Sequence, residues 1–242
     1  MRIVIKLGTS TLAHPTGLLN IKRVEELCKV MSDLKNAGNE IIIVSSGAIG
    51  MGAGKLVLSE KPKDIRTKQA AAAVGQCELM YTYDKLFSEY NHTVAQILIT
   101  GEDIEHAERS RNFENTMLRL LELGAIPIIN ENDSVATDEI VIGDNDTLGA
   151  IVAKSISADL LILLSDIDGL FTADPHKDKN AVLLSEVKEI TPEIEGMTGG
   201  AGSRLGTGGM TTKLNAAKIA TAAGIDMVIA NGKEPTVLYD IT

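Results

Sequence analysis

Two lysines beside glycine-rich turns are the residues of this 242-residue chain best suited to chemistry on an anion. Lys6 ends a short apolar run and Gly8 follows closely, so an ammonium and backbone N–H groups would meet at one turn. Lys213 lies in the first turn of a predicted helix, directly after the glycine-rich segment 206–209. There the helix dipole, backbone donors and ammonium would converge on a phosphate. A solvated lysine at an ordinary turn is the alternative interpretation of Lys6.

A third glycine-rich stretch, residues 45–54, follows another apolar run. Its small residues would let the backbone approach an anion at a helix N-terminus. The stretch is not a P-loop, because Ile49 replaces a glycine and Leu56 follows Lys55 where serine or threonine is required. A purely structural turn explains it equally well.

Carboxylate and amide side chains form two clusters, residues 130–133 and 144–146, on either side of a segment typical of a hairpin, 135–144. Turns and helix caps use the same residue types. Two clusters that bracket one hairpin nevertheless favour a polar ligand or a metal. A further polar turn, 165–168, could contact a sugar or a metal, although turn chemistry explains it too.

The elements that must position these residues alternate along the chain. Apolar, β-branched runs predict six buried strands, at 2–7, 40–44, 93–99, 125–129, 160–164 and 226–229. Helical spacing predicts helices at 21–34, 66–90 (long or broken), 113–121 and from 211 to Gly224. This alternation predicts a mostly parallel sheet covered on both faces, whose ligands bind beyond the carboxyl ends of the strands.

Composition argues against several classes of protein. The chain has 33 acidic and 23 basic residues, a net charge of −10 and 3% aromatic residues, which disfavours a nucleic-acid binder. It has no apolar run long enough to span a membrane and no signal-peptide pattern at its start, which predicts a cytoplasmic protein.

Cys28 and Cys77 lack the spacing of a disulfide or zinc framework and are expected to be buried. The four scattered histidines disfavour histidine catalysis and a zinc site.

Two lysines on glycine-rich turns and several aspartates favour phosphoryl transfer, which depends on positioning and charge neutralisation. Taken in order, the segments that carry these features resemble the amino acid kinase family over nearly the whole chain; they are 6–10, 45–49, 68–76, 129–137, 141–146, 165–175 and 206–213. The resemblance implies an α/β fold: a three-layer αβα sandwich of the carbamate kinase-like type, with an open, mostly parallel sheet. It also implies one domain over 1–242, with the amino acid on the N-terminal half and ATP on the C-terminal half.

The resemblance also implies roles for individual residues. Lys6 and Lys213 would neutralise the transferring phosphoryl group, and Asp146 would hold both lysines in place. The amino acid would be bound by Ser46, Asp133 and Asn145, with Asp133 paired to its ammonium group. The nucleotide would contact Lys6, Ser165, Asp166, Thr207, Gly208, Gly209, Met210, Thr211, Thr212 and Lys213. Serine at position 165 keeps the hydroxyl of the threonine often found there in the family. Mg²⁺ would be held largely by phosphate oxygens, so no protein ligand is assigned to it.

The sequences I-N-E-N-D, G-D-N-D and G-T-G-G-M-T-T-K resemble the branch of the family that phosphorylates the γ-carboxylate of L-glutamate, the first step of proline biosynthesis. This implies ATP as co-substrate, feedback inhibition by proline, a homo-oligomer (dimer or tetramer) and handover of the product to glutamyl phosphate reductase. Many bacterial members carry a C-terminal PUA domain, which we expect to be absent here. The alternatives are an aspartate or N-acetylglutamate kinase and a non-catalytic nucleotide- or amino-acid-sensing module. Retention of both lysines and Asp146 disfavours the sensing module.

Overall fold

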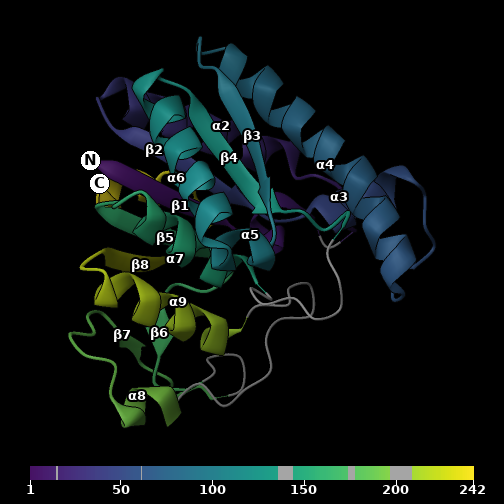
Figure 1. Cartoon of the computed structure of the whole chain (residues 1–242). Helices are drawn as coiled ribbons and strands as arrows, with labels where there is room; N and C mark the ends of the chain where they lie inside the picture. The colour runs from purple at the N-terminus through teal and green to yellow at the C-terminus, as the bar shows by residue number, and fades with distance from the viewer. Residues whose placement is uncertain (15, 61, 136–143, 174–177, 197–208) are drawn as a thin grey trace.

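Six parallel strands form the central sheet of the protein, here a computed structural model that describes every residue except 15, 61, 136–143, 174–177 and 197–208. The strands are β1 (Arg2–Leu7), β2 (Glu40–Ser45), β3 (Val94–Ile99), β4 (Ile126–Glu131), β5 (Leu160–Ser165) and β8 (Asp226–Asn231). Their order across the sheet is β3-β4-β2-β1-β5-β8 (Figure 1). A separate antiparallel pair consists of β6 (Leu170–Phe171) and β7 (Leu183–Leu184). Because all six strands of the main sheet are parallel, their carboxyl ends share one edge.

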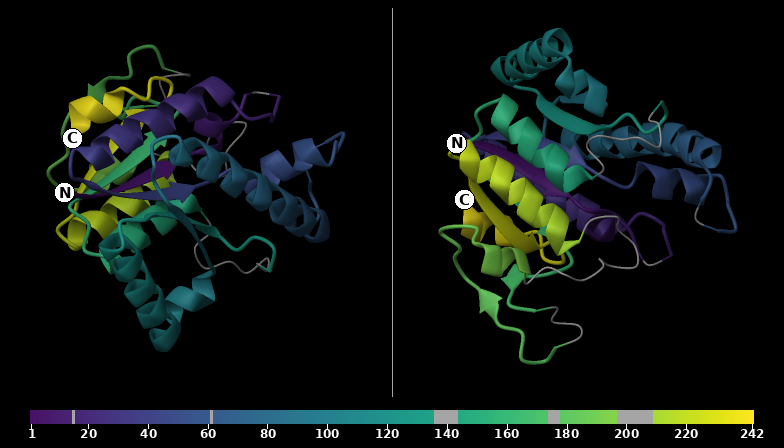
Figure 2. Two further views of the ribbon diagram at one scale, coloured as in Figure 1. Left: turned by 90° about the horizontal axis from the view of Figure 1, so that it is seen from above. Right: turned by 60° about the horizontal axis from the view of Figure 1, so that its bottom comes forward.

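Helices cover both faces of this sheet, as Figure 2 shows. The helices in the described residues are α1 (Thr9–Leu12), α2 (Ile21–Asn36), α3 (Ala48–Lys55), α4 (Ile65–Ser88), α5 (Gly101–Glu105), α6 (Ala107–Glu122), α7 (Asn145–Ser155), α8 (Pro192–Gly196), α9 (Met210–Ala222) and α10 (Val237–Ile241). Helix α8 has no buried residue and lies away from the central sheet, below β6 and β7 in Figure 1. Successive strand residues point to opposite faces. Ile3 and Ile5 therefore belong to a core with α2, α4 and α10, whereas Val4 belongs to a core with α6, α7 and α9. Both cores together confirm the predicted αβα sandwich.

The predicted strands are all present, with small differences at their ends. One difference matters for the site: β4 continues to Glu131, so Asn130 and Glu131 are buried strand residues and not, as predicted, part of the following turn. Asn130 remains in the strand because its side chain finds a buried partner in Gln76. The predicted helix at 66–90 is a single unbroken helix, α4. The segment 136–143 and residues 197–208, which include most of the predicted hairpin and glycine-rich loop, lie outside the described residues.

The prediction for the two cysteines is half right. Cys28 is buried in α2, but Cys77 is exposed on α4. No helix within the described ranges is both long and apolar enough to cross a membrane.

Helices α3 and α4 approach each other so closely that only glycine fits at the crossing. A Cβ atom on Gly75 would lie 1.8 Å from the carbonyl oxygen of Ala48, and one on Gly52 would lie 1.7 Å from that of Ala71. The obstacles are backbone atoms, which cannot turn aside as a flexible side chain can. The crossing therefore fixes α4 against α3, the helix that follows Ser46.

We expect Gly75→Ala to lower the free energy of unfolding by about 2 kcal/mol or more, because the two helices must move apart to accept the methyl group. Gly50→Ala is the matched control, since a Cβ atom at this other helical glycine meets nothing within 4 Å. Alanine there should stabilise α3 slightly through its higher helix propensity. Urea denaturation measures both variants. A Gly75→Ala protein as stable as the wild type would contradict the close crossing.

Candidate active site

Asp146 lies between two lysine ammonium groups at the carboxyl edge of the sheet. Its Oδ1 is 2.6 Å from Nζ of Lys6, and its Oδ2 is 3.0 Å from Nζ of Lys213. Lys6 comes from the end of β1, Asp146 from the first turn of α7 and Lys213 from the first turn of α9. The structure thus brings together the three residues predicted to carry the chemistry, although Lys6 and Lys213 are 207 positions apart.

The charges of this cluster determine its chemistry. Asp146 is 1% exposed. Burial alone would raise the pKa of its carboxyl, but the charges of Lys6 and Lys213 and the hydrogen bonds to it hold the pKa below the ordinary value. One carboxylate thus faces two ammonium groups, which leaves an excess of one positive charge. A buried excess charge of this kind attracts a transferring phosphoryl group strongly, because little water screens it.

Thr212 ties the start of α9 to the same carboxylate. Its hydroxyl lies 2.8 Å from Oδ2 of Asp146 and 2.8 Å from the carbonyl oxygen of Gly209. Gly209 is the N-cap residue of α9 and has no side chain to accept from the first-turn N–H groups. Those donors and the positive end of the helix dipole suit an anion.

A second group of residues surrounds the side-chain amide of Asn145. Its Nδ2 donates toward the hydroxyl of Ser46 at 2.8 Å, the carbonyl of Ser45 at 3.0 Å and Oδ1 of Asn130 at 3.1 Å. Asp144 caps α7 by accepting from the backbone N–H of Thr147 at 2.8 Å, which fixes Asn145 at the helix start. The predicted substrate residues Ser46 and Asn145 are therefore in direct contact.

Beside this amide lies an acidic corner made of Glu131, Asp133 and Asp144. Burial, then the nearby charges of Asp133 and Asp144, raise the pKa of Glu131 to about 7. Burial also raises the pKa of Asp133, the third predicted substrate residue. An ammonium group bound here would relieve the repulsion between these carboxyls. The sequence places Glu131 in a polar cluster and assigns it no role; the one signal for it is an acid close behind the apolar run 125–129.

Glu131 should make stability depend on pH. Because its pKa is about 7 in the folded protein and 4.5 ordinarily, the folded chain binds more protons than the unfolded chain between these values. The contribution of Glu131 to the free energy of unfolding is therefore fully present below about pH 4.5 and is lost as the pH rises toward about 7. With allowance for solvent screening, we expect wild-type stability to fall by about 1–2 kcal/mol relative to Glu131→Gln over this range. Parallel stability curves for the two proteins in urea denaturation would contradict this.

Ser165 and Asp166, predicted to bind the nucleotide, lie on the other side of Lys6, where Ser165 ends β5 and Asp166 follows it. The hydroxyl of Ser165 donates to Oδ1 of Asp166 at 3.2 Å. Because β1 lies between β2 and β5, Lys6 stands between the Ser46–Asn145 pair and these two residues. Thr207 and Gly208 lie outside the described residues, whereas Gly209 is the N-cap of α9 and Met210 and Thr211 are its first two residues.

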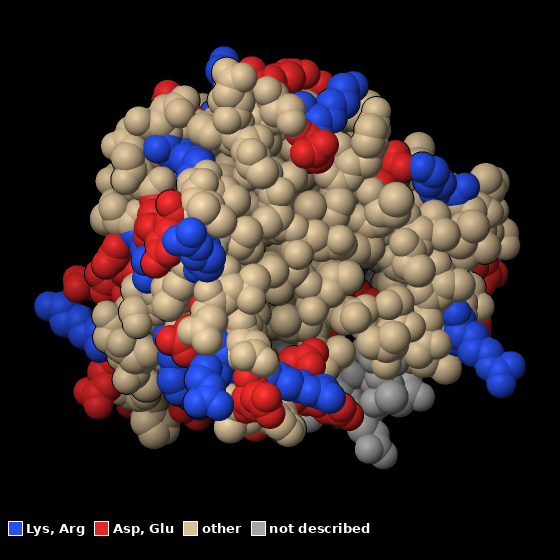
Figure 3. Space-filling view, turned by 45° about the horizontal axis from the view of Figure 1, so that its top comes forward, with Lys and Arg blue, Asp and Glu red and all other residues tan. Residues whose placement is uncertain are grey.

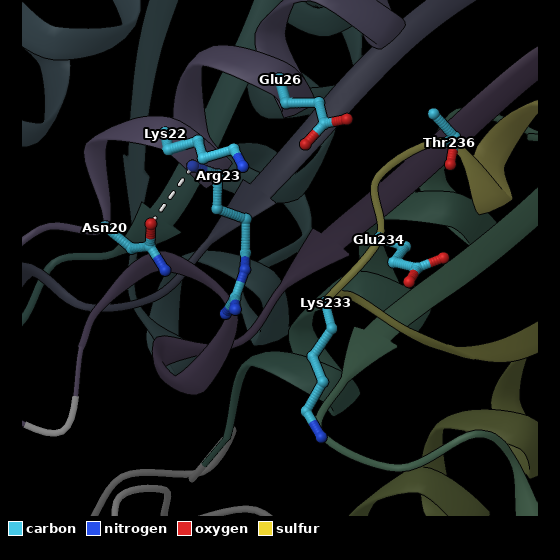
Figure 4. A pocket seen from close by; sticks show the side chains of 7 residues that line it. All are labelled: Asn20, Lys22, Arg23, Glu26, Lys233, Glu234 and Thr236. Atoms are coloured by element: carbon cyan, nitrogen blue, oxygen red, sulfur yellow. Dashed lines mark hydrogen bonds between the residues drawn. The ribbon is translucent and has the colours of Figure 1, made fainter.

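The pocket in Figure 4, about 440 Å³ in volume, does not coincide with this arrangement. It lies between the start of α2 and the turn before α10, and its lining residues are Asn20, Lys22, Arg23, Glu26, Lys233, Glu234 and Thr236. None of them belongs to the predicted site, and the lining mixes both signs of charge. The Arg23 guanidinium instead donates to the carbonyl of Ser10, in α1, at 3.2 Å. We therefore assign the chemistry to the lysine–aspartate cluster.

No group of three or more histidine, cysteine, aspartate or glutamate side chains in the described part of the chain has the arrangement of a metal site. An Mg²⁺ ion that arrives with a nucleotide needs no such cage, because phosphate oxygens and water supply most of its ligands.

Comparison with known proteins agrees with this geometry. The model of the amino acid kinase family matches residues 1–231. The glutamate 5-kinase of Clostridium perfringens is 55% identical over 99% of this chain and 91% of its own length. The glutamate 5-kinase of Clostridium acetobutylicum is 57% identical over 99% and 90%, respectively.

Solved structures share the fold at low sequence identity. Carbamate kinase from Giardia lamblia, bound to AMP-PNP, superposes with a TM-score of 0.70 at 16% identity, covering 99% of this chain and 94% of that one. Isopentenyl phosphate kinase from T. acidophilum gives a TM-score of 0.68 at 18% identity, covering 100% and 95%.

Proposed function

The chain belongs to the amino acid kinase family, and we propose that it phosphorylates the γ-carboxylate of L-glutamate with ATP, the first step of proline biosynthesis. The products are L-glutamyl 5-phosphate and ADP. The observation that carries this proposal is the position of Lys6, which pairs with Asp146, the carboxylate that Lys213 also pairs with. Lys6 lies between two groups of polar residues. Ser46 and Asn145 lie on the β2 side, and Ser165 and Asp166 lie at the end of β5. The two groups suit the amino acid and the nucleotide, respectively.

The reaction needs no general base. The side-chain carboxyl of glutamate has an ordinary pKa of about 4.3, so it is already an ionised nucleophile at neutral pH. One of its oxygens attacks the γ-phosphorus of ATP while the bond to the bridging oxygen breaks, and ADP leaves with that electron pair. The difficulty is repulsion between two anions, and the ammonium groups of Lys6 and Lys213 offset it. Asp133 pairs with the α-ammonium of glutamate in the acidic corner.

Mg²⁺ bound to the phosphates would supply further neutralisation of their charge. Its ligands would be mainly phosphate oxygens and water, since the described residues hold no group of carboxylates arranged as a metal site. We therefore assign no protein side chain to it.

The test uses the wild-type protein with ATP, Mg²⁺ and a panel of phosphoryl acceptors: the carboxylic acids L-glutamate, L-aspartate and N-acetylglutamate, and an isoprenoid phosphate. Hydroxylamine traps an acyl phosphate as a hydroxamate. We expect hydroxamate and ADP with L-glutamate and little with the others. Activity with aspartate or N-acetylglutamate alone would move the protein to another branch of the family. ATP binding in calorimetry without turnover would favour a sensing module.

We further propose a homo-oligomer, a dimer or tetramer. The edge strand β3 has mostly half-buried apolar side chains, and Tyr81 on the neighbouring α4 is 63% exposed. On the face in Figure 3, charged side chains gather at the periphery around a broad uncharged area. Sedimentation equilibrium measures the assembly.

Two partners follow from the same chemistry, and both remain proposals. Proline has a carboxylate and a ring ammonium, which match the α-carbon end of glutamate, so it should inhibit competitively at the acidic corner. The product is an acyl phosphate that hydrolyses or cyclises readily, which favours direct handover to glutamyl phosphate reductase. The cytoplasm is the proposed location.

A further inference from the structure

Two polar side chains lie on the buried face of α4, where their neighbours are apolar. Gln76 and Tyr83 are seven positions apart, two helical turns, and therefore lie on the same face. They are 7% and 0% exposed. Leu79 and Phe87 on that face simply fill the core. Neither polar residue has a part in the proposed reaction, so their presence there calls for a reason.

Each of the two makes a buried hydrogen bond to the end of a different strand. Oε1 of Gln76 accepts from Nδ2 of Asn130, on β4, at 2.9 Å. The hydroxyl of Tyr83 lies 2.9 Å from the hydroxyl of Ser45, on β2. Because Ser45 donates its proton to the carbonyl of Ser46, Tyr83 is the donor in this pair. Burial raises the pKa of Tyr83, so the hydroxyl keeps its proton.

Both partners are acceptors for the same amide, that of Asn145. Its Nδ2 approaches Oδ1 of Asn130 and the backbone carbonyl of Ser45. Oδ1 of Asn130 also accepts from the backbone N–H of Glu131 at 2.9 Å. The amide of Asn130 is therefore held in one orientation, with its oxygen toward Asn145 and its nitrogen toward Gln76.

We propose that Gln76 is a positioning residue for the amino-acid substrate, acting through Asn130 on Asn145; this rests on the function proposed above. Without the acceptor at position 76, Nδ2 of Asn130 loses its partner, and only the contacts at Oδ1 still hold the amide. The oxygen that helps to orient Asn145 beside Ser46 is then held less firmly. A role in packing alone does not explain a glutamine here. Its Nε2 is buried with no partner among the described residues, and an apolar side chain of the same size would avoid that cost.

The experiment compares Gln76→Met, which keeps the shape and removes the acceptor, with Leu79→Ala, which removes core packing from the same helix face. We expect Gln76→Met to raise KM for glutamate by about tenfold and to change KM for ATP by less than about twofold. Leu79→Ala should lower Tm while leaving both KM values within about twofold of the wild type. Equal KM values for glutamate in Gln76→Met and the wild type would overturn the proposal.

Tyr83→Phe removes a single hydroxyl group and gives a second measurement of KM for glutamate if Gln76→Met folds poorly. Loss of its hydroxyl should raise KM for glutamate by about threefold through Ser45.

The double variant Gln76→Met, Asn145→Ala tests whether Gln76 acts through Asn145. The effect of Gln76→Met on KM for glutamate should largely vanish when the amide of Asn145 is removed. Full additivity would overturn action through Asn145. If another acid is the substrate, the same KM comparison is made with that acid, so failure of the proposed function remains distinguishable.

Discussion

The Lys213→Ala protein should turn over at least ~10³-fold more slowly than the wild type, because the variant lacks one of two cations that stabilise the transition state. Lys213 is 5% exposed and held by Asp146 at 3.0 Å, so water has little room to replace its charge. The excess positive charge of the cluster also disappears, since Asp146 then faces Lys6 alone. The loss should fall on kcat more than on KM for ATP, because the interaction strengthens as the phosphoryl group moves.

Lys218→Ala is the matched control for this variant. Lys218 lies five residues further along α9, half-exposed, and pairs with Glu195 at the surface. Such pairs contribute little to stability, so its kcat should equal that of the wild type within about twofold. Steady-state kinetics with saturating substrates measure both. Near-normal turnover of Lys213→Ala would contradict the role assigned to this lysine.

Replacing Asp146 with asparagine should affect activity and stability together. The variant keeps the shape of the side chain but leaves two buried ammonium groups without a counter-charge. Breaking a buried pair in this way costs about 3–5 kcal/mol of folding free energy. Lys6 and Lys213 also repel each other and shift from their positions, so kcat should fall by at least ~10²-fold.

ATP should partly restore the stability of Asp146→Asn, because phosphate oxygens supply the missing negative charge. We therefore expect ATP to raise Tm more in the variant than in the wild type. Glu40→Gln is the control, since it breaks the half-exposed pair with Arg2 (2.8 Å) near the start of β1 and should change little. An Asp146→Asn protein with wild-type Tm and no added response to ATP would contradict the charge balance described here.

Sequence reasoning could identify the charged cluster because of a simple property of parallel sheets. Lys6 and Asp146 each lie where a strand ends or the next helix begins, and these positions meet at one edge. The apolar runs predicted the strands because both faces of the sheet are covered. The amino acid kinase resemblance then assigned roles that spacing alone left open.

The hydrogen bonds that join Gln76 to Asn130 and Tyr83 to Ser45 could not be predicted in the same way. Gln76 meets Asn130 across 54 positions and Tyr83 meets Ser45 across 38, so each contact depends on how α4 packs over the sheet. In the sequence, Gln76 ends the alanine-rich segment 68–76, which resembles the amino acid kinase family, but nothing in that segment gives Gln76 a role. The sequence predicts too early an end for β4 for a related reason: polar residues after an apolar run resemble a turn until their buried partners are known.

The central claim, that a γ-carboxylate oxygen of glutamate attacks ATP, is tested most directly with isotopically labelled substrate. L-Glutamate carrying ¹⁸O in both γ-carboxylate oxygens reacts with ATP in the presence of hydroxylamine, which displaces phosphate from the acyl phosphate by attack at its carbonyl carbon. Mass spectrometry of the phosphate formed in step with the hydroxamate should find one ¹⁸O atom per molecule. Glutamate-dependent release of unlabelled phosphate would show that water accepted the phosphoryl group and would contradict the account.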